Sequence, residues 1–359
     1  MNIVFRVDAS LKMGTGHLMR CLTLADALKA KGANCHFISR EHPGNLNTAI
    51  LQRGHLLSVL PFVSTELQLD STCAPHADWL GTTWQNDAIQ TLERIAGVWV
   101  DWLIVDHYAL DHRWERQVAK HCGRLFVIDD LADRNHDCSI LLDQNLGRQA
   151  KDYSQRVPSS CQLLLGPQFS LLRPEFVQLR EQSLAHREGR RLGNLLISMG
   201  GVDAQNVTGK ILVSLQPVVD QQWNIQIVMG SSAPWITEIE ALAKRMPCST
   251  KVLINTNKMA ELMSEADLAI GAAGSTSWER CCLGLPSIIL ILADNQRGIG
   301  EQLETAGVAV LIKSLSSINM ELPKQLEYFS NPTHLHKMAK AAEKITDGNG
   351  TLRVLSYFY

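Results

Sequence analysis

Short apolar strands alternate with helical segments along this chain, and this alternation constrains the fold more than any other feature. In the first half, the predicted strands lie at 2–9, 33–39, 56–60, 102–106, 125–128 and 139–142, with predicted helices at 16–31, 45–53, 84–96 and 113–122. Strands that are separated by helices pair in parallel, because a right-handed crossover brings the chain back to the same end of the sheet. The sequence therefore predicts an open α/β sheet.

The alternation stops at a charged helical segment, 176–191, and then starts again. The later predicted strands lie at 194–199, 224–229, 251–254, 268–270 and 287–292, and the later predicted helices at 208–218, 235–245, 259–265, 277–283 and 333–345. A length of 359 residues suits two domains. We expect a first domain at 1–175, a connector at 176–191, a second domain at 192–335 and a helical tail at 336–359.

Charge and cysteine content narrow the class of protein. The chain has 34 Lys+Arg against 36 Asp+Glu, a formal net charge of -2, which argues against a dedicated nucleic-acid binder. No apolar run is long enough to span a bilayer, and the first residues enter a strand with no signal-peptide pattern. The nine cysteines are scattered with no CxxC pair, which indicates reduced thiols. We expect a cytoplasmic monomer that binds a small ligand, without membrane or nucleic-acid partners.

The first motif is DASLKMGTGHLMR, at Asp8–Arg20. Gly14 and Gly16 permit a tight turn from strand to helix and close approach of backbone N–H groups to a ligand. His17 follows in the first helical turn, where the helix dipole disfavours the imidazolium and leaves a neutral ring able to accept a proton from water. A surface or capping histidine would look the same. The third glycine of the dinucleotide fingerprint is missing, which disfavours a nicotinamide enzyme.

The second motif is IGAAGSTSWERCCLGLPSIILILADNQ, at Ile270–Gln296. After a strand, a turn with Gly274 leads to hydroxyl side chains where a helix begins, an arrangement suited to a diphosphate. Glu279 in the first helical turn suits the hydroxyls of a ribose. Helix capping alone would explain any one of these residues, but it explains the whole run less well. The candidate ligand-binding residues here are Gly274, Ser275, Thr276, Glu279, Asn295 and Gln296.

Three weaker signals also fall at strand ends. The segment SMGGVDAQN, at Ser198–Asn206, is another glycine turn with residues able to cap the next helix. Asp106–Tyr108 and Asp129–Asp130 place carboxylates where a sugar could be held. A metal site is disfavoured, and we expect neither metal nor cofactor. The nearest metal-ligand candidates, His107, Asp129 and His136, lack tight ligand spacing.

Four blocks of sequence, in this order, resemble the PseG family of UDP-2,4-diacetamido-2,4,6-trideoxy-β-L-altropyranose hydrolases in pseudaminic acid biosynthesis. They are GTGH with the following Met19–Cys21, GPQFSLLRPEF at 166–176, GAAGSTSWERCCLGLP at 271–286 and ADNQ at 293–296. The resemblance spans residues 1 to about 310, whereas 64–85 and the tail after about 314 do not align. The second-domain glycine and glutamate pattern more distantly resembles the UDP-GlcNAc transferase of lipid II formation.

The resemblance implies a GT-B fold, in which two Rossmann-like domains with parallel sheets face each other across a cleft. It further implies metal-independent, inverting hydrolysis of a UDP-sugar by water, in a pathway that glycosylates flagellin or surface polysaccharide. His17 matches the general base, Ser275 and Thr276 the diphosphate turn, Glu279 the ribose carboxylate, and Asn295 and Gln296 the sugar side. The remaining expected substrate contacts are Gly14, Thr15, Gly16, Gly274 and Arg20, with Arg6 or Arg20 meeting the diphosphate charge. Three rival functions remain open: a GT-B glycosyltransferase, a hydrolase of another nucleotide-linked diacetamido sugar, and a non-catalytic nucleotide-sugar binder.

Overall fold

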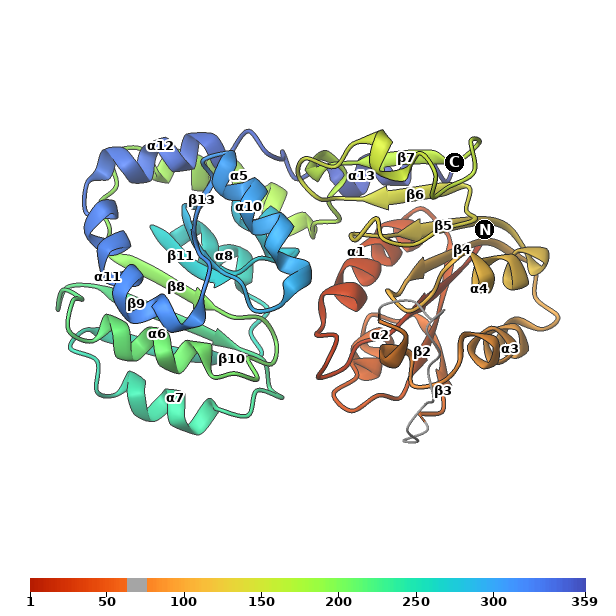
Figure 1. Ribbon diagram of the computed structural model, residues 1–359, viewed down its shortest axis with the longest axis horizontal. Helices are drawn as coiled ribbons and strands as arrows, with labels where there is room; N and C mark the ends of the chain where they lie inside the picture. The colour runs from red at the N-terminus through yellow and green to blue at the C-terminus, as the bar shows by residue number, and fades with distance from the viewer. Residues whose placement is uncertain (63–75) are drawn as a thin grey trace. The chain divides into compact units, whose positions relative to one another are not determined.

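The computed structural model describes residues 1–62 and 76–359, apart from the side chain of Asn295 (Figure 1). The chain divides into two compact units. Unit 1 comprises Met1–Leu171 together with Gly350–Tyr359, and unit 2 comprises Leu172–Asn349. The division does not coincide with the expected boundaries at 175, 191 and 336, because the connector belongs to unit 2 and the chain returns to unit 1 at its end.

Among the described residues of unit 1, seven strands form one parallel sheet in the order β3-β2-β1-β4-β5-β6-β7. The strands are β1 (Asn2–Val7), β2 (Asn34–Arg40), β3 (Leu56–Leu60), β4 (Val100–Asp106), β5 (Cys122–Ile128), β6 (Ile140–Asp143) and β7 (Gln162–Leu165). The α-helices are α1 (Gly16–Ala30), α2 (Asn47–Gln52), α3 (Trp84–Ile95), α4 (His112–Val118) and α13 (Gly350–Leu355). The order reverses between β1 and β4, which is the position where open sheets of this kind bind ligands.

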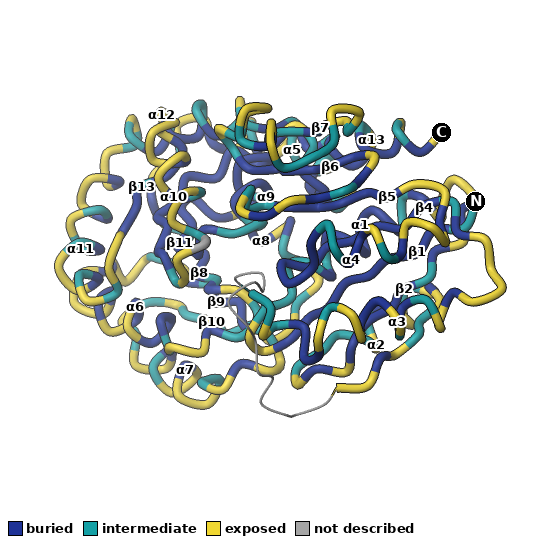
Figure 2. Tube along the Cα trace, turned by 45° about the vertical axis from the view of Figure 1, so that its right-hand side comes forward, coloured by how far each residue is buried: buried dark blue, intermediate teal, exposed yellow. Residues whose placement is uncertain are grey.

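Strand β1 is buried on both faces, as a central strand of a parallel sheet must be. Ile3, Phe5 and Val7 pack in a core with α1 and α13, whereas Val4 packs in a second core with Trp114 of α4. Figure 2 shows the buried strands inside and the exposed outer helix faces. Because α13 contributes to the first core, the last helix of the chain is an integral part of unit 1.

Among the described residues of unit 2, six parallel strands follow the equivalent order β10-β9-β8-β11-β12-β13. The strands are β8 (Asn194–Ser198), β9 (Asn224–Met229), β10 (Ser249–Ile254), β11 (Leu268–Ala272), β12 (Ser287–Leu290) and β13 (Ala309–Ile312). The α-helices are α5 (Pro174–His186), α6 (Val207–Leu215), α7 (Ile236–Ala243), α8 (Met259–Glu265), α9 (Thr276–Cys282), α10 (Arg297–Thr305), α11 (Ile318–Phe329) and α12 (Pro332–Ala342). Here the order reverses between β8 and β11.

Helix α5 is tightly bonded to the rest of unit 2 and is not a free connector. Pro174 begins the helix at a position where a missing N–H costs nothing. The Ser183 hydroxyl donates to the Leu283 carbonyl at 2.8 Å, and Arg187 Nε donates to the same carbonyl at 2.7 Å. The helix that covers most of the expected connector at 176–191 therefore packs as part of unit 2.

Two expectations from composition concern membranes and thiols. Among the described residues, no helix combines the length and the apolar character needed to cross a bilayer. The cysteines that the structure describes are free thiols, most of them buried. Cys73 lies outside the described residues.

Candidate active site

The loop between β1 and α1 places His17 at the carboxyl edge of the sheet. Gly14 has φ +77°, a conformation that favours glycine, and its N–H donates to the Ser10 carbonyl at 2.8 Å. This turn closes the loop directly before α1, which begins at Gly16. His17 is therefore the second residue of the helix, in the first turn where the sequence placed it.

Asp106 is the partner of His17, and it is the last residue of β4. Strands β1 and β4 are neighbours, with Val7 paired to Asp106, so the two loops meet at the point where the strand order reverses. His17 Nδ1 lies 2.6 Å from Asp106 Oδ1. An ionised carboxylate only accepts hydrogen bonds, so Nδ1 carries the proton, and in the neutral ring the lone pair is then on Nε2. Within the described part of the chain no hydrogen bond engages Nε2, which leaves it available as a base.

Arg20 keeps Asp106 ionised. Its Nε donates to Asp106 Oδ2 and its Nη2 to Oδ1, both at 2.7 Å, while Nη1 donates to Asp130 Oδ2 at 2.5 Å. Burial raises the pKa of the Asp106 carboxyl, but the charges of Arg20 and His17 outweigh burial and hold that pKa below its usual value. Arg20 is itself buried, and its guanidinium faces these two carboxylates. It thus acts on His17 through Asp106, and its Nη2 also lies 3.3 Å from His17 Nδ1.

Arg6 was the other candidate for meeting the diphosphate, and the structure excludes it. Its side chain is 0% exposed, with ion pairs of 2.6 Å to both Asp8 and Asp87. A guanidinium that is wholly enclosed and paired on both sides is not accessible to a ligand. Arg6 instead supports the end of β1 from inside the protein.

An aromatic cluster flanks His17. The Tyr108 ring meets the His17 ring edge to face, with centroids 4.5 Å apart, and its hydroxyl donates to Asp130 at 3.1 Å. His76 and Trp79 extend the cluster, with ring centroids 5.5 and 5.8 Å from that of Tyr108. Sequence reasoning missed these two residues because they lie in a stretch without a periodic pattern, and only the fold brings them to His17.

The two carboxylates of the second candidate pair, Asp129 and Asp130, have different partners. Asp130 accepts from Arg20, as described above. Asp129 is fully buried and accepts from Arg134 at 2.8 Å and from the Tyr153 hydroxyl at 2.9 Å, so it is not free to hold a sugar. The same hydroxyl lies 2.8 Å from Asp143 Oδ2, although it has a single proton to donate. Burial, with the nearby charge of Asp130, raises the pKa of Asp143 to about 7 against the opposing charge of Arg148. When Asp143 is protonated, its hydroxyl donates to the Tyr153 oxygen, while Arg148 Nε donates to the same Oδ2.

In unit 2, the turn between β11 and α9 contains Ser275, whose hydroxyl is not used in a capping hydrogen bond. Ser275 precedes α9, yet its side chain makes no capping hydrogen bond, so capping does not explain this residue. Glu279 lies one turn later, with Oε1 3.7 Å from Arg173 Nη2. Burial raises the pKa of Glu279, and the charges of Arg173 and Arg280 offset this only in part. Its carboxyl therefore lacks full compensation within the unit.

The other two predicted turns of unit 2 are bonded internally. Asp203 accepts from the backbone N–H groups of Val207 and Thr208 at 2.8 and 2.9 Å and so caps α6, which is a structural role. Gln296 Oε1 accepts from the Leu292 N–H at 3.1 Å and ties the short helix at 294–296 to the end of β12. Asn295 lies in that same short helix.

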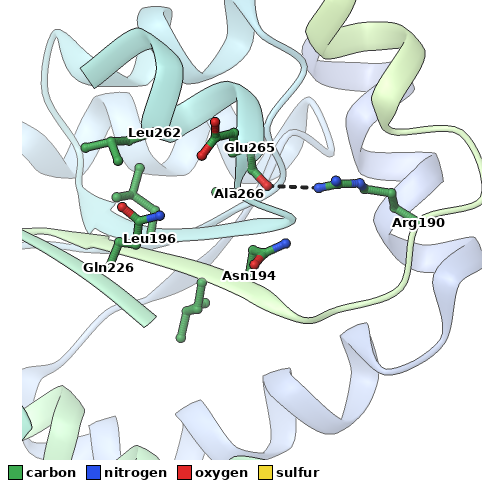
Figure 3. Close-up of a pocket in the computed structure, with 8 residues that line it drawn as sticks. Arg190, Asn194, Leu196, Gln226, Leu262, Glu265 and Ala266 are labelled. Carbon is green, nitrogen blue, oxygen red and sulfur yellow. Dashed lines mark hydrogen bonds between the residues drawn. The ribbon is translucent and has the colours of Figure 1, made fainter. Parts of the chain in front are cut away.

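A cavity of about 230 Å³ lies elsewhere in unit 2 (Figure 3). It is lined in part by Asn194 and Ala266, at the amino ends of β8 and β11, and Arg190 donates to the Glu265 carbonyl beside it at 2.9 Å. The candidate ligand turns follow the carboxyl ends of these strands. The cavity is therefore at the opposite edge of the sheet from the turn that carries Ser275.

Comparisons with known proteins identify the fold. Residues 199–351 match the model of the Glycosyltransferase family 28 C-terminal domain. The structure of MurG from Acinetobacter baumannii is similar with a TM-score of 0.67 at 17% identity, covering 99% of both chains. The chain has a GT-B fold. A UDP-GlcNAc 2-epimerase from Neisseria meningitidis, solved bound to UDP-GlcNAc, is similar with a TM-score of 0.57 at 13% identity, also covering 99% of both chains.

Similar sequences extend through both units. The Campylobacter jejuni UDP-2,4-diacetamido-2,4,6-trideoxy-beta-L-altropyranose hydrolase is 25% identical, over 87% of this GT-B chain and 100% of its own length. The Bacillus subtilis spore coat polysaccharide biosynthesis protein SpsG is 24% identical, over 99% and 96%. The Methanocaldococcus jannaschii protein MJ1062 is 26% identical over 83% of the chain. This match spans only 57% of the length of that relative. The relatives whose names state a reaction are enzymes that act on UDP-sugars.

Proposed function

We propose that this GT-B protein hydrolyses UDP-2,4-diacetamido-2,4,6-trideoxy-β-L-altropyranose to UDP and 2,4-diacetamido-2,4,6-trideoxy-L-altrose, a step of pseudaminic acid biosynthesis in the cytoplasm. The observation that carries the proposal is the His17–Asp106 pair, which leaves Nε2 of His17 free to take a proton. The similarity to the Campylobacter hydrolase over most of the chain supports the choice of substrate.

Unit 2 binds the nucleotide in this proposal. The uncommitted hydroxyl of Ser275 and the adjoining turn, with Gly274 and Thr276, receive the diphosphate. The partly compensated carboxyl of Glu279 accepts hydrogen bonds from the ribose hydroxyls. Asn295 and Gln296 contact the sugar side, as do the backbone groups of the 14–16 turn in unit 1.

Unit 1 supplies the base. His17 Nε2 takes a proton from water as the water oxygen bonds to the anomeric carbon from the face opposite UDP. The C1–O bond breaks with inversion, and its electron pair stays on the diphosphate oxygen of the departing UDP. The imidazolium that forms is stabilised by Asp106, 2.6 Å from Nδ1, which Arg20 holds in the ionised state. The proposed step needs no metal ion and no cofactor.

The variant His17→Asn tests this role. It should bind the UDP-sugar normally while turnover falls on the order of 10²–10⁴-fold, which is the usual contribution of a general base. Turnover is followed by UDP release, and binding by calorimetry. His121→Asn, at an exposed histidine of the same unit, is the control and should match wild type. Wild-type turnover in His17→Asn would remove His17 from the mechanism.

A glycosyltransferase is the second candidate, favoured by the similarity to MurG and to a Caldanaerobacter UDP-N-acetylglucosamine transferase that is 22% identical over 51% of the chain. A transferase would release UDP only when an acceptor hydroxyl is present. A panel of UDP- and CDP-linked diacetamido sugars, followed by NMR without acceptor, separates the candidates. A non-catalytic binder would release no nucleotide from any of them, and a related hydrolase would prefer another sugar.

A further inference from the structure

Arg280, on α9, carries a buried positive charge with only neutral partners. The residue is 3% exposed. Its Nη2 donates to the Ala272 carbonyl at 3.0 Å and to the Ser277 hydroxyl at 2.9 Å, and its Nη1 donates to the Thr276 hydroxyl at 3.3 Å. Its buried Nε has no hydrogen-bond partner. Among the described residues, no carboxylate forms an ion pair with this guanidinium.

The absence of a side chain at Gly271 leaves space for the Arg280 guanidinium. A Cβ added to Gly271, the residue before the end of β11, would lie 2.5 Å from Arg280 Nη1 and 3.2 Å from the Ser198 carbonyl oxygen, so a larger residue would displace the guanidinium from this position. Burial lowers the pKa of Arg280 to about 10, against the opposing effects of Cys281 and Glu279. A buried charge normally has a partner of opposite sign, because its desolvation is costly otherwise. The chain leaves space for this guanidinium, but among the described residues no carboxylate pairs with it. This indicates a counter-charge that comes from outside the chain.

Arg187 is a second buried guanidinium of unit 2, and burial lowers its pKa to about 10 as well, but it contacts the opposite ends of helices. Its Nη1 donates to the Ala266 carbonyl at 2.8 Å and its Nε to the Leu283 carbonyl at 2.7 Å, at the carboxyl ends of α8 and α9. Those carbonyls are the negative ends of helix dipoles. Arg280 instead contacts the first turn of α9, where the exposed N–H groups are positive as well. The charge of Glu279, also in the first turn of α9, offsets this positive potential only in part, because it makes no ion pair with Arg280.

We infer that Arg280 is the buried counter-charge of the diphosphate, a positioning residue that acts on the nucleotide through the turn between β11 and α9. Its hydrogen bonds to Thr276, Ser277 and Ala272 fix the turn that receives the ligand. Its charge attracts a diphosphate more strongly than an uncharged nucleoside. The inference rests on the proposed nucleotide-binding function of unit 2 and adds a specific requirement for negative charge in the ligand.

Calorimetry with UDP and with uridine, on the full chain, separates charge from structure. Arg280→Met should weaken UDP binding on the order of 10- to 100-fold, as expected for loss of one charge near an anionic ligand at an intermediate dielectric constant. Uridine binding should change by less than about threefold. Arg280→Lys retains the charge and should keep most of the preference for UDP. Arg187→Met, the matched buried arginine outside the turn, should leave the ratio of UDP to uridine affinity unchanged.

Each other result has a definite meaning. Equal losses of UDP and uridine affinity in Arg280→Met would show a purely structural role and overturn the inference, as would unchanged UDP affinity. If Arg280→Met fails to fold, Arg280→Gln provides the neutral side chain and is compared with Arg280→Lys in the same way. Wild-type protein that binds neither UDP nor uridine would contradict the proposed function itself, and with it this inference.

Discussion

Replacing Asp106 by asparagine changes the charge beside His17 while preserving the shape of the side chain. In the wild type, Asp106 Oδ1 lies 2.6 Å from His17 Nδ1 and fixes the proton there. An amide at this position can also donate to Nδ1, which would move the proton to Nε2 and block the base. The imidazolium formed during the reaction would also lose its counter-charge. Asp106→Asn therefore changes the tautomer of His17 and also removes the counter-charge of its imidazolium.

The expected magnitude follows from this distance. Two unit charges 2.6 Å apart, at an effective dielectric constant of about 20, attract by about 6 kcal/mol, which is an upper bound. Arg20 shares the same carboxylate and offsets part of this attraction. We expect kcat to fall on the order of 10²–10⁴-fold, comparable with the loss when the aspartate of a serine protease triad becomes asparagine. The KM should change little, because Asp106 is buried behind His17.

The assay measures UDP release from the UDP-sugar under steady-state conditions, with folding checked by circular dichroism. Asp26→Asn is a matched control, because Asp26 Oδ1 also bonds a histidine, His55 Nε2, at 2.7 Å, farther along α1 from the candidate site. Its kcat should equal the wild-type value. A folded Asp106→Asn protein with kcat within about threefold of wild type would refute the role of the pair, since general-base contributions are larger than that.

Two further predictions concern the nucleotide and the pH dependence of stability. Glu279→Gln should weaken uridine binding about tenfold, because a charged acceptor of the ribose hydroxyls is lost; unchanged affinity in calorimetry would reject this contact. Asp143 has a pKa of about 7 in the folded protein, above that of the unfolded chain, so the folded state binds its proton more tightly. The stabilisation is complete below about pH 4 and is lost as the pH rises through about 7. The free energy of unfolding of Asp143→Asn relative to wild type should therefore rise between pH 5 and pH 8, by at most about 3 kcal/mol. If the free energies of unfolding of the two proteins, measured by urea denaturation, change equally with pH across this range, Asp143 does not have a raised pKa in the folded state.

The two parallel sheets were predictable because most strands carry a clear apolar pattern. The predicted strands at 56–60 and 224–229 and the helix at 259–265 match the structure residue for residue. Two four-residue strands, β7 and β13, were missed, since a run that short is indistinguishable from a loop in one sequence. Helix α11 was missed as well, and it contains Pro323, which ordinarily argues against a helix.

The site was predictable only where a motif is local in the chain. His17 was found because a glycine turn and a helix start surround it. Its partner Asp106 is 89 positions away, and the pairing depends on β1 and β4 being neighbours, which one sequence does not reveal. Sequence reasoning assigned Asp106 to sugar binding, and it mistook the enclosed Arg6 for a ligand contact. The unusual feature of Arg280 is the absence of a charged partner, which only the packing exposes.

The most direct test of the central claim is hydrolysis of the UDP-sugar in ¹⁸O-labelled water without any acceptor. Attack of water on the anomeric carbon predicts UDP release at the full rate, with no ¹⁸O in the UDP by ³¹P NMR and with the inverted anomer as the first sugar product. Label in the β-phosphate of UDP would show cleavage at phosphorus, and UDP release that requires an acceptor would show a transferase. Either result would contradict a hydrolase that uses His17 to activate water.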